Sequence, residues 1–316
     1  MPSVGSPSKK QRAFFSGRFT LEIGERGGKA VDLVNSVDGG HFKSEAIGEQ
    51  VGADGITTRY PGRQKFEDIT LQVGTAMSPT FWDWIRNSLD NNYQRKNGAV
   101  VAYDFDGKER SRRTFYDALI SEVGFPTLDA KAKDPAYLTV KIAPERMEWE
   151  AGSDGATAPR SEPSKQKLWV PSNFRFRIDG FSTEMMKWVQ KVDAFTLKQN
   201  IILNPIGREL YVRKEVGRVE YPNLTFYVPE TYGKPWIDYW KTFVGKGEHT
   251  SKNEHTAMIE YLSSDLTKVL MQIDFGGVGI TGVTFDKHEA GTDSMRMYKI
   301  ECYSESMKLR PGTGNK

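Results

Sequence analysis

Hydrophobic and polar residues alternate with a period of two along several short stretches of the chain, and others are rich in β-forming residues, which together predict β-strands. In the first half the pattern covers residues 19–23, 69–73, 99–105, 114–119 and 137–142. The second half repeats it at residues 174–178, 194–197, 224–228, 258–261, 269–273 and 297–302. Asp106-Gly107 is a strong hairpin signal between two of these stretches. The fold is therefore expected to be mainly β, in the α+β class.

One segment in each half has helical spacing instead. Ser78-Pro79 offers an N-cap and a proline at the first helical position, and apolar residues follow at three- and four-residue intervals. The segment from Pro235 to Val244 has the same spacing. Each half is thus predicted to be a small β-barrel or sandwich with one packed helix. The four helical tryptophans are assigned to the core: Trp82, Trp84, Trp236 and Trp240.

The two halves carry these signals in the same order. Tyr60-Pro61 and Tyr221-Pro222 lie 161 residues apart, and Tyr103 and Tyr261 lie 158 apart. About 150 residues can close their own core, so the pattern predicts a duplicated domain rather than a solenoid. We divide the chain into a flexible tail (1–12), a first domain (13–150), a Gly-, Ser-, Pro- and Ala-rich linker (151–166) and a second domain (167–316).

Composition narrows the function classes. The 316 residues have a formal charge of +3, with 21 basic and 21 acidic residues through Glu150 and 23 against 20 afterwards. Neither half has the basic excess of a nucleic-acid-binding domain, so no sequence-specific nucleic acid is expected. One cysteine excludes an internal disulfide framework, and neither a secretory signal nor a membrane span is predicted. We expect assembly in the cytoplasm of the host cell.

The residues that could carry chemistry match no catalytic, cofactor or metal pattern. The cluster Gly276–Gly282 follows a strand but is followed by another rather than by a helix, which favours a bulged or flexible segment between strands. His249 and His255 have no compact ligand spacing and are assigned to a solvated loop. Cys302 lies in a predicted strand, where a thiol behaves as a small apolar side chain. We therefore expect no enzyme, no cofactor and no metal.

Two polar segments suggest contacts with other subunits. The segment Lys43–Gly62 exceeds an ordinary hairpin connection, which indicates that it protrudes and meets a partner. The densest basic run follows the Asp106-Gly107 turn. It is either a solvated strand face or a charged contact to a neighbouring subunit, and its cations are Lys108, Arg110, Arg112 and Arg113.

Four motifs in order resemble the tail tube protein family of contractile phages and of the inner tubes of contractile injection systems. They are residues 60–71 (YPGRQKFEDITL), Phe81-Trp82-Asp83-Trp84, residues 95–101 (RKNGAVV) and the Asp106-Gly107 hairpin. The resemblance covers about residues 13–150. The second half keeps Tyr221-Pro222 and the Trp236 helix but lacks the Pro-Gly-Arg and Arg-Lys-Asn-Gly signatures.

The resemblance implies two tandem tail-tube-like β-barrel or sandwich domains in a structural, non-enzymatic protein. Family members form six-fold rings whose strands join around a lumen, and the rings stack through an extended hairpin, here about Lys43 to Leu71. The stacking residues implied are Lys43, Glu45, Gly48, Gly52, Gly55, Arg59, Arg63 and Lys65.

Because a standard tube subunit has one such domain, the duplication implies either a trimer with pseudo-six-fold symmetry or a hexamer. The expected partners are further copies of the chain, the tail tube protein, baseplate hub or spike proteins and the sheath, all within the virion tail or injection particle. A tube initiator or baseplate hub, joining a trimeric spike to the hexameric tube, is favoured over a bulk tube subunit. A carbohydrate- or ligand-binding β-protein, motivated by the aromatic content, and a hydrolase remain more distant alternatives.

Overall fold

The computed structural model describes residues 17–25, 30–50, 57–153, 169–205, 211–285 and 295–312. The first half contains helix α1 (Pro79–Leu89) and the strands β1 (Arg18–Ile23), β2 (Ala30–Gly39), β3 (Phe42–Gln50), β4 (Thr57–Phe66), β5 (Ile69–Val73), β6 (Lys96–Tyr103), β7 (Glu109–Phe125), β8 (Leu128–Asp129), β9 (Leu138–Ala143) and β10 (Arg146–Ala151). The predicted mainly β fold is confirmed.

The second half has a similar order of elements, with the short helix α2 (Thr183–Met186) and two further helical turns added, and with no counterpart of β8 among its described residues. Its strands are β11 (Phe174–Ile178), β12 (Lys191–Val192), β13 (Phe195–Asn204), β14 (Arg213–Glu220), β15 (Leu224–Pro229), β16 (His255–Leu262), β17 (Val269–Phe285), β18 (Met297–Tyr303) and β19 (Ser306–Pro311). Its other helices are η2 (Glu230–Tyr232), α3 (Lys234–Trp240) and the π-helical turn η3 (Lys241–Gly245).

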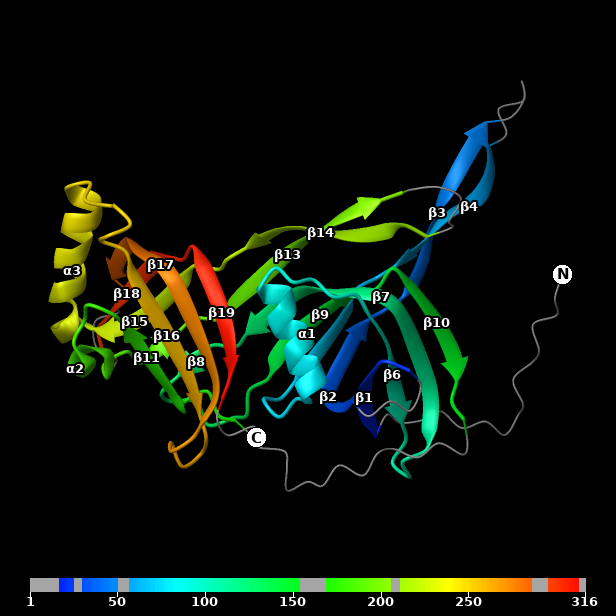
Figure 1. Ribbon diagram of the computed structural model, residues 1–316, viewed down its shortest axis with the longest axis horizontal. Helices are drawn as coiled ribbons and strands as arrows, with labels where there is room; N and C mark the ends of the chain where they lie inside the picture. The colour runs from blue at the N-terminus through cyan, green and yellow to red at the C-terminus, as the bar shows by residue number, and fades with distance from the viewer. Residues whose placement is uncertain are drawn as a thin grey trace.

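The first half forms a closed barrel around the long strand β7 (Figure 1). Neighbouring strands pair in the order β7, β6, β1, β2, β5, β9, and β9 returns to β7. Strand β7 has 17 residues and is long enough to pair with two strands along each of its edges. Strands β6 and β13 follow one another along one edge, and β10 and β9 follow one another along the other. Closure removes most of the edges that an open sheet would expose.

The second half forms a barrel-like sheet around β17, which is the counterpart of β7. Its strands pair in the order β11, β16, β17, β18, β15, β12, with β19 on β17. Strand β12 has only two residues, and α2 lies between β11 and β12 in the chain. The described residues therefore show no pairing between β11 and β12, whereas their counterparts β1 and β2 pair over five residues.

The halves exchange strands. Strand β13 pairs with β7 and carries β14 with it onto the first sheet, while β8 of the first half pairs with β12 of the second. One hydrophobic core runs through both halves. Strand β10 extends to Ala151, inside the predicted linker, and Gly152 donates its N–H to the carbonyl of Arg110 over 2.9 Å. The predicted tail and the rest of the linker lie outside the described residues, so the domain boundaries stay predictions.

The duplication is visible in strand register. In the β3–β4 hairpin Lys43 pairs with Lys65, and in the β13–β14 hairpin Lys198 pairs with Glu220, 155 positions later on each strand. Both hairpins have a register shift two positions further along, between Ser44 and Ala46 and between Gln199 and Ile201. Two hairpins with the same pairing and the same bulge are equivalent elements of a repeat.

That register corrects one sequence correspondence. Tyr60-Pro61 lies within β4, whereas Tyr221-Pro222 lies between β14 and β15, so the two dipeptides are not equivalent. The residue that corresponds to Tyr221 is Phe66, because the hairpin repeat is 155 rather than 161 residues. Tyr103 and Tyr261 do fall on the equivalent strands β6 and β16.

Both predicted helices are present. Ser78 caps α1 by accepting a hydrogen bond from the N–H of Phe81 at 3.2 Å, and Pro79 occupies the first turn. The buried carboxylate of Asp32 on β2 accepts from the Ser78 hydroxyl at 2.7 Å, which ties the start of the helix to the barrel. Burial raises the pKa of Asp32. Helix α3 begins without a side-chain cap and ends in the π-helical turn η3, within the span predicted for a helix.

Candidate assembly surfaces

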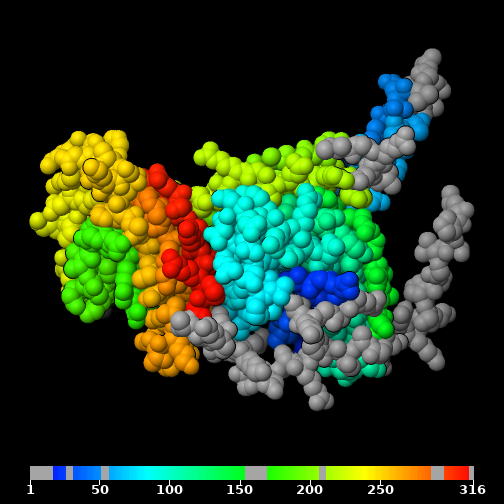
Figure 2. All heavy atoms as spheres, in the orientation of Figure 1, coloured from blue at the N-terminus to red at the C-terminus, as the bar shows by residue number. Residues whose placement is uncertain are grey.

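The hairpin of β3 and β4, residues 42–50 and 57–66, projects from the body of the molecule, and we call it the first arm (Figure 2). Every described residue of β3 is exposed, and β4 is exposed except at Gly62 and Phe66. The protruding segment predicted from the sequence is therefore a two-stranded hairpin. Gly62 suits the bulge of this hairpin, because a Cβ there would lie 3.0 Å from the Ile47 side chain and 3.2 Å from the Glu45 carbonyl oxygen.

Most residues assigned to ring stacking lie on the two strands of the first arm. Gly48 pairs with Arg59 and Lys43 with Lys65, and Lys65 forms an ion pair with Glu45 across the strands. Arg63 is exposed on β4. Gly52 and Gly55 lie outside the described residues. The described members of the set therefore share one exposed hairpin, which makes it a candidate contact surface.

The base of the first arm is held by a small cluster. Phe42 and Phe66 pack edge to face with ring centroids 6.0 Å apart. Glu67 pairs with Lys43 and with His41, whose Nδ1 lies 3.0 Å from the carboxylate. The hydrogen bond from Lys43 is the main reason that the pKa of Glu67 is lowered. These contacts fix the direction in which the arm leaves the barrel.

The equivalent hairpin of β13 and β14, residues 195–204 and 213–220, is docked on the first barrel, and we call it the second arm (Figure 1). Lys214 of β14 anchors it. Its N–H donates to the carboxylate of Glu145 at 2.9 Å, and its ammonium group lies 3.0 Å from the carboxylate of Asp68. Arg95 pairs with Glu145 and donates to the Lys214 carbonyl oxygen at 2.7 Å. Arg95 begins the Arg-Lys-Asn-Gly signature, so that motif contributes directly to holding the second arm.

The second arm joins the first barrel through an internal junction, which we define as the pairing of residues 195–198 on β13 with residues 122–125 on β7. Phe195 stacks on Phe125 with centroids 4.9 Å apart and meets the ring of Phe275 edge to face at 5.6 Å. Helix α1 contacts β19 beside this junction, as Figure 2 shows where the cyan and red segments meet. The junction therefore combines strand pairing with aromatic and helix packing.

The basic run is largely engaged within the chain. Arg112 is buried, and its guanidinium forms ion pairs with Glu22 at 2.7 Å and with Glu109 at 3.0 Å. Burial by itself lowers the pKa of Arg112, but its hydrogen bonds to Glu22 and Glu109 outweigh burial and raise it. Arg112 is thus enclosed by its own chain, and we drop it from the proposed contacts with neighbouring subunits.

The other cations of the run differ in exposure. Arg110 pairs with Asp104 at 2.6 Å, and Arg113 donates to the Gly39 carbonyl oxygen at 2.8 Å. Burial lowers the pKa of Arg113. Lys108 is exposed. The contacts of Arg110 and Arg113 therefore stabilise the turn and the barrel. Within the basic run, Lys108 and Arg110 remain candidates for contact with another subunit.

The helical tryptophans are mostly in the core. Trp82, Trp84 and Trp236 are buried, and the Trp84 indole N–H donates to the Gln94 carbonyl oxygen at 2.8 Å. Trp240 is half-buried and donates to the Thr281 carbonyl oxygen at 3.1 Å. A platform for stacking sugars needs exposed rings, so the three buried indoles offer no basis for carbohydrate binding.

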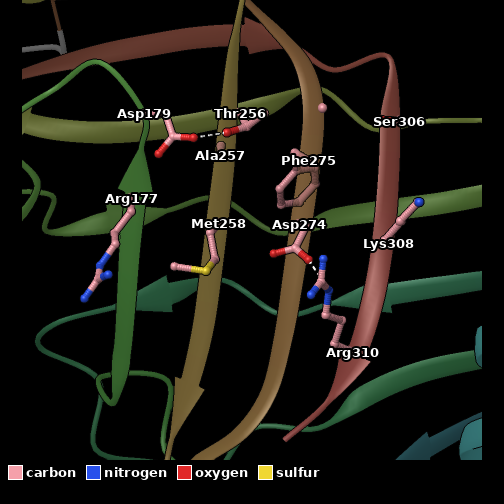
Figure 3. Close-up of a pocket in the computed structure, with 11 residues that line it drawn as sticks. Arg177, Asp179, Thr256, Ala257, Met258, Asp274, Phe275, Ser306, Lys308 and Arg310 are labelled. Carbon is pink, nitrogen blue, oxygen red and sulfur yellow. Dashed lines mark hydrogen bonds and ion pairs between the residues drawn. The ribbon is translucent and has the colours of Figure 1, made fainter.

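A groove of about 430 Å³ crosses strands β11, β16, β17 and β19 on the outer surface of the second barrel (Figure 3). Asp179 accepts a hydrogen bond from the Thr256 hydroxyl, and Arg310 pairs with Asp274 at 2.5 Å. Besides these paired groups, the groove is lined by the charged side chains of Arg177 and Lys308 and by the side chain of Met258. It has the character of a solvated sheet surface.

Two residues considered for chemistry have structural surroundings. His255 begins β16 rather than lying in a loop, and it packs between Phe181 and Tyr239, with centroids 5.3 and 4.9 Å away. Burial lowers its pKa. Cys302 is buried in β18, where burial raises the pKa of its thiol to about 12. A thiol of that pKa is protonated at neutral pH and is a poor nucleophile.

The glycine cluster is part of a strand. Strand β17 runs through residues 276–282, so the segment predicted between strands is wrong, although a register shift does occur between Ile280 and Gly282. In the described part of the chain no group of three or more His, Cys, Asp or Glu side chains gathers as a metal site. Within those same residues, no helix is long and apolar enough to cross a membrane.

The described residues form two barrel-like sheets with one projecting hairpin, and a comparison with known proteins indicates the class of protein. Residues 16–148 match the family model of the T4-like virus tail tube protein gp19. The resemblance predicted from the motifs is thereby confirmed for the first half. By this match the first half of the chain is similar to a structural protein of the phage tail tube.

Three solved structures are similar to part of the chain. The sheath–tube complex of an extracellular contractile injection system (PVC) in its extended state is 22% identical, with a TM-score of 0.38, over 46% of this chain and 99% of that one. The corresponding sheath/tube terminator is 23% identical, with a TM-score of 0.36, over 47% and 100%. The tube-terminating cap of the anti-feeding prophage is 19% identical, with a TM-score of 0.37, over 48% and 99%. No curated protein matches the chain.

Proposed function

We propose that this protein is the tube initiator or baseplate hub ring of a contractile tail or injection system, where a trimeric spike meets a hexameric tube. The single observation that carries the proposal is the internal junction, which joins two equivalent barrels within one chain. A chain with two tube-like units supplies the six units of a ring with three copies, and three copies match a trimeric partner.

The difference between the halves supports a position at the end of the tube. The first half keeps the tail tube motifs and matches the family, and its arm projects freely. The second half has a shortened β12, the added helix α2 and a docked arm. We propose that the first arm carries the contact with the next tube ring, through the residues from Lys43 to Lys65 named above. Lys108 and Arg110 would add charged contacts between neighbouring subunits.

The bulk tube subunit is the second candidate, because the family matched by residues 16–148 is a tail tube protein. In either role the partners are further copies of the chain, the tail tube protein and baseplate proteins, and the particle tail is the location. The two roles differ in where the chain lies along a particle and in how many copies it contributes.

Gold labelling of a tagged chain in purified particles tests the role, and mass measurement of the isolated ring tests the copy number. An initiator or hub predicts label at one end of each tube and a ring of three chains. Label along the whole tube would favour the bulk subunit. A purified chain that stays monomeric at all concentrations would contradict both roles.

A further inference from the structure

The internal junction has an unfilled equivalent in the second barrel. Strand β7 shifts register against β9 between Ile120 and Glu122, and β17 shifts against β18 between Ile280 and Gly282, 160 positions later. The two long strands therefore correspond residue by residue in this region. Residues 122–125, which accept the second arm, correspond to residues 282–285, and we call the latter the free edge.

The free edge has a partner on one side. On that side β18 pairs with residues 282–285, which matches the pairing of β9 with β7. On the other side the pairing of β16 with β17 ends at Val278, just as the pairing of β6 with β7 ends at Ala118. The following stretch of β7 then receives β13, but no strand in the described part of the chain pairs with the same stretch of β17. An unpaired strand edge presents backbone N–H and C=O groups to another strand.

Burial differs between the two barrels at the equivalent positions. Phe125 is 2% exposed at the internal junction, whereas its counterpart Phe285 is 61% exposed. On the helices beside these strands, Leu89 of α1 is 3% exposed and its counterpart Val244 is 44% exposed. At these positions the second barrel therefore exposes large apolar side chains. The first barrel buries the equivalent side chains at or beside the internal junction.

The first arm shows the complementary difference. Leu197 of the docked second arm is 2% exposed, whereas its counterpart Phe42 is 52% exposed. The last strand of each half shows the same difference, because Leu309 on β19 is 3% exposed and its counterpart Trp149 on β10 is 57% exposed. In the internal junction α1 contacts β19, so Trp149 is the surface on which an equivalent of α1 would pack.

We propose that the base of the first arm of one chain, at Phe42 and Lys43, pairs with the free edge of a second copy of the chain in the register of the internal junction, and that the arm beyond Lys43 stays available for the next tube ring. Phe42 then lies opposite Val283 as Leu197 lies opposite Val123, and Lys43 lies opposite Gly282 as Lys198 lies opposite Glu122. Helix α3 of the second copy covers Trp149 of the first.

The occupant must be a second copy because of where the two surfaces lie. Figure 1 shows the first arm at one end of the molecule and the second barrel at the other, so a chain cannot fill its own edge. The contact is head to tail, and such contacts form either closed rings or open filaments. Closure after three chains rests on the proposed ring function, whereas the pairing rests on the repeat of register and burial.

Cysteine pairs test the register. Phe42→Cys and Val283→Cys are placed on two separate chains, which are mixed and oxidised. The matched control is Leu197→Cys with Val123→Cys on one chain, which occupies the equivalent positions of the internal junction. Cys302 stays in place, because it is buried, and the parent chain serves as the blank. Directly opposed strand residues lie within disulfide reach.

The expected result is a covalent dimer from the mixture, none from either variant alone, and a cross-link within single chains for the control. Both cysteines placed on one chain should give a ladder that ends at three chains. Shifting the register with Phe42→Cys and Phe285→Cys should lower the yield at least tenfold. Rings that assemble without the dimer, while the control cross-links, would overturn the pairing and leave the ring function standing.

A second variant avoids the need for a disulfide. Phe285→Asp places a charge on the free edge, at a side chain that is 61% exposed and whose ring packs on Tyr298 at 4.6 Å, so the monomer should stay folded with only a small loss in melting temperature. Assembly should then require at least tenfold more protein in analytical ultracentrifugation. Unchanged assembly of this variant would overturn the proposal. A parent chain that forms no oligomer at all would overturn the ring function as well.

Discussion

Replacing Arg112 by methionine asks whether the basic run serves the barrel or a neighbouring subunit. The guanidinium is enclosed with the carboxylates of Glu22 and Glu109, at 2.7 and 3.0 Å. Removing the cation leaves two carboxylates in a site where all three side chains are at most 7% exposed. Breaking a buried ion pair by removing one partner costs about 3–5 kcal/mol. We expect a loss of that size in the free energy of unfolding.

The assay is denaturant unfolding of the monomer, with two matched variants beside it. Lys108→Met removes an exposed cation from the same run and should change the free energy by less than about 0.5 kcal/mol. The triple variant Arg112→Met, Glu22→Gln, Glu109→Gln removes the whole ionic group and should recover most of the loss. An Arg112→Met chain that is as stable as the parent but fails to assemble would refute the reasoning and restore Arg112 as a contact between subunits.

Three further predictions concern the first arm, the core and pH. Deleting Glu45 to Thr57 should leave a folded chain, since β3 is exposed along its length, but stop assembly; circular dichroism and electron microscopy check the two parts. Trp84→Ala should lower the free energy of unfolding by about 3–5 kcal/mol, because it removes a fully buried indole that packs on Phe115 and donates a hydrogen bond to the Gln94 carbonyl oxygen. Burial lowers the pKa of His255 below its unfolded value, so the unfolded chain binds more protons as pH falls below about 6.5, and stability should drop there. Melting temperatures of the parent between pH 7.5 and 5 should show a steeper fall than those of His255→Gln.

Local signals predicted the elements well. The caps at Ser78 and Pro79, the Asp106-Gly107 turn and the alternating strands are short-range patterns, and each appears where the sequence placed it. The helix in the second half was also found, although its last residues form a π-helical turn that no residue pattern indicates. The overall class, mainly β with two barrel-like sheets, followed from these elements.

The sequence did not predict which strands and which charged residues come together when they are far apart along the chain. The pairing of β13 with β7 joins residues about 70 positions apart, and β-strand patterns do not specify which edge a strand meets. The sequence did not show that Arg112 is buried, because one of the carboxylates that pair with it, Glu22, lies 90 positions away along the chain. Similarly, the Tyr-Pro dipeptides suggested a repeat length that only the hairpin bulges corrected.

The first-half signature also gains a physical reason. A Cβ at Gly98 would lie 2.3 Å from the Glu22 carbonyl oxygen and 2.6 Å from the Phe115 ring, so only glycine fits beneath that ring. Arg95, three residues earlier, holds the second arm through Glu145 and the Lys214 carbonyl. One short motif thus serves both the packing of the barrel and the attachment of its neighbour.

The internal junction changes how the proposed ring would nucleate. A junction formed within one chain depends on folding alone, because the linked partner is present at a fixed effective concentration. Each association of separate chains costs an estimated 4–15 kcal/mol or more in lost translational and rotational freedom. A ring of six separate units needs five such associations before closure, while three fused pairs need two. The first ring of a tube could then form at protein concentrations too low for later rings to start by themselves, which would make elongation follow initiation.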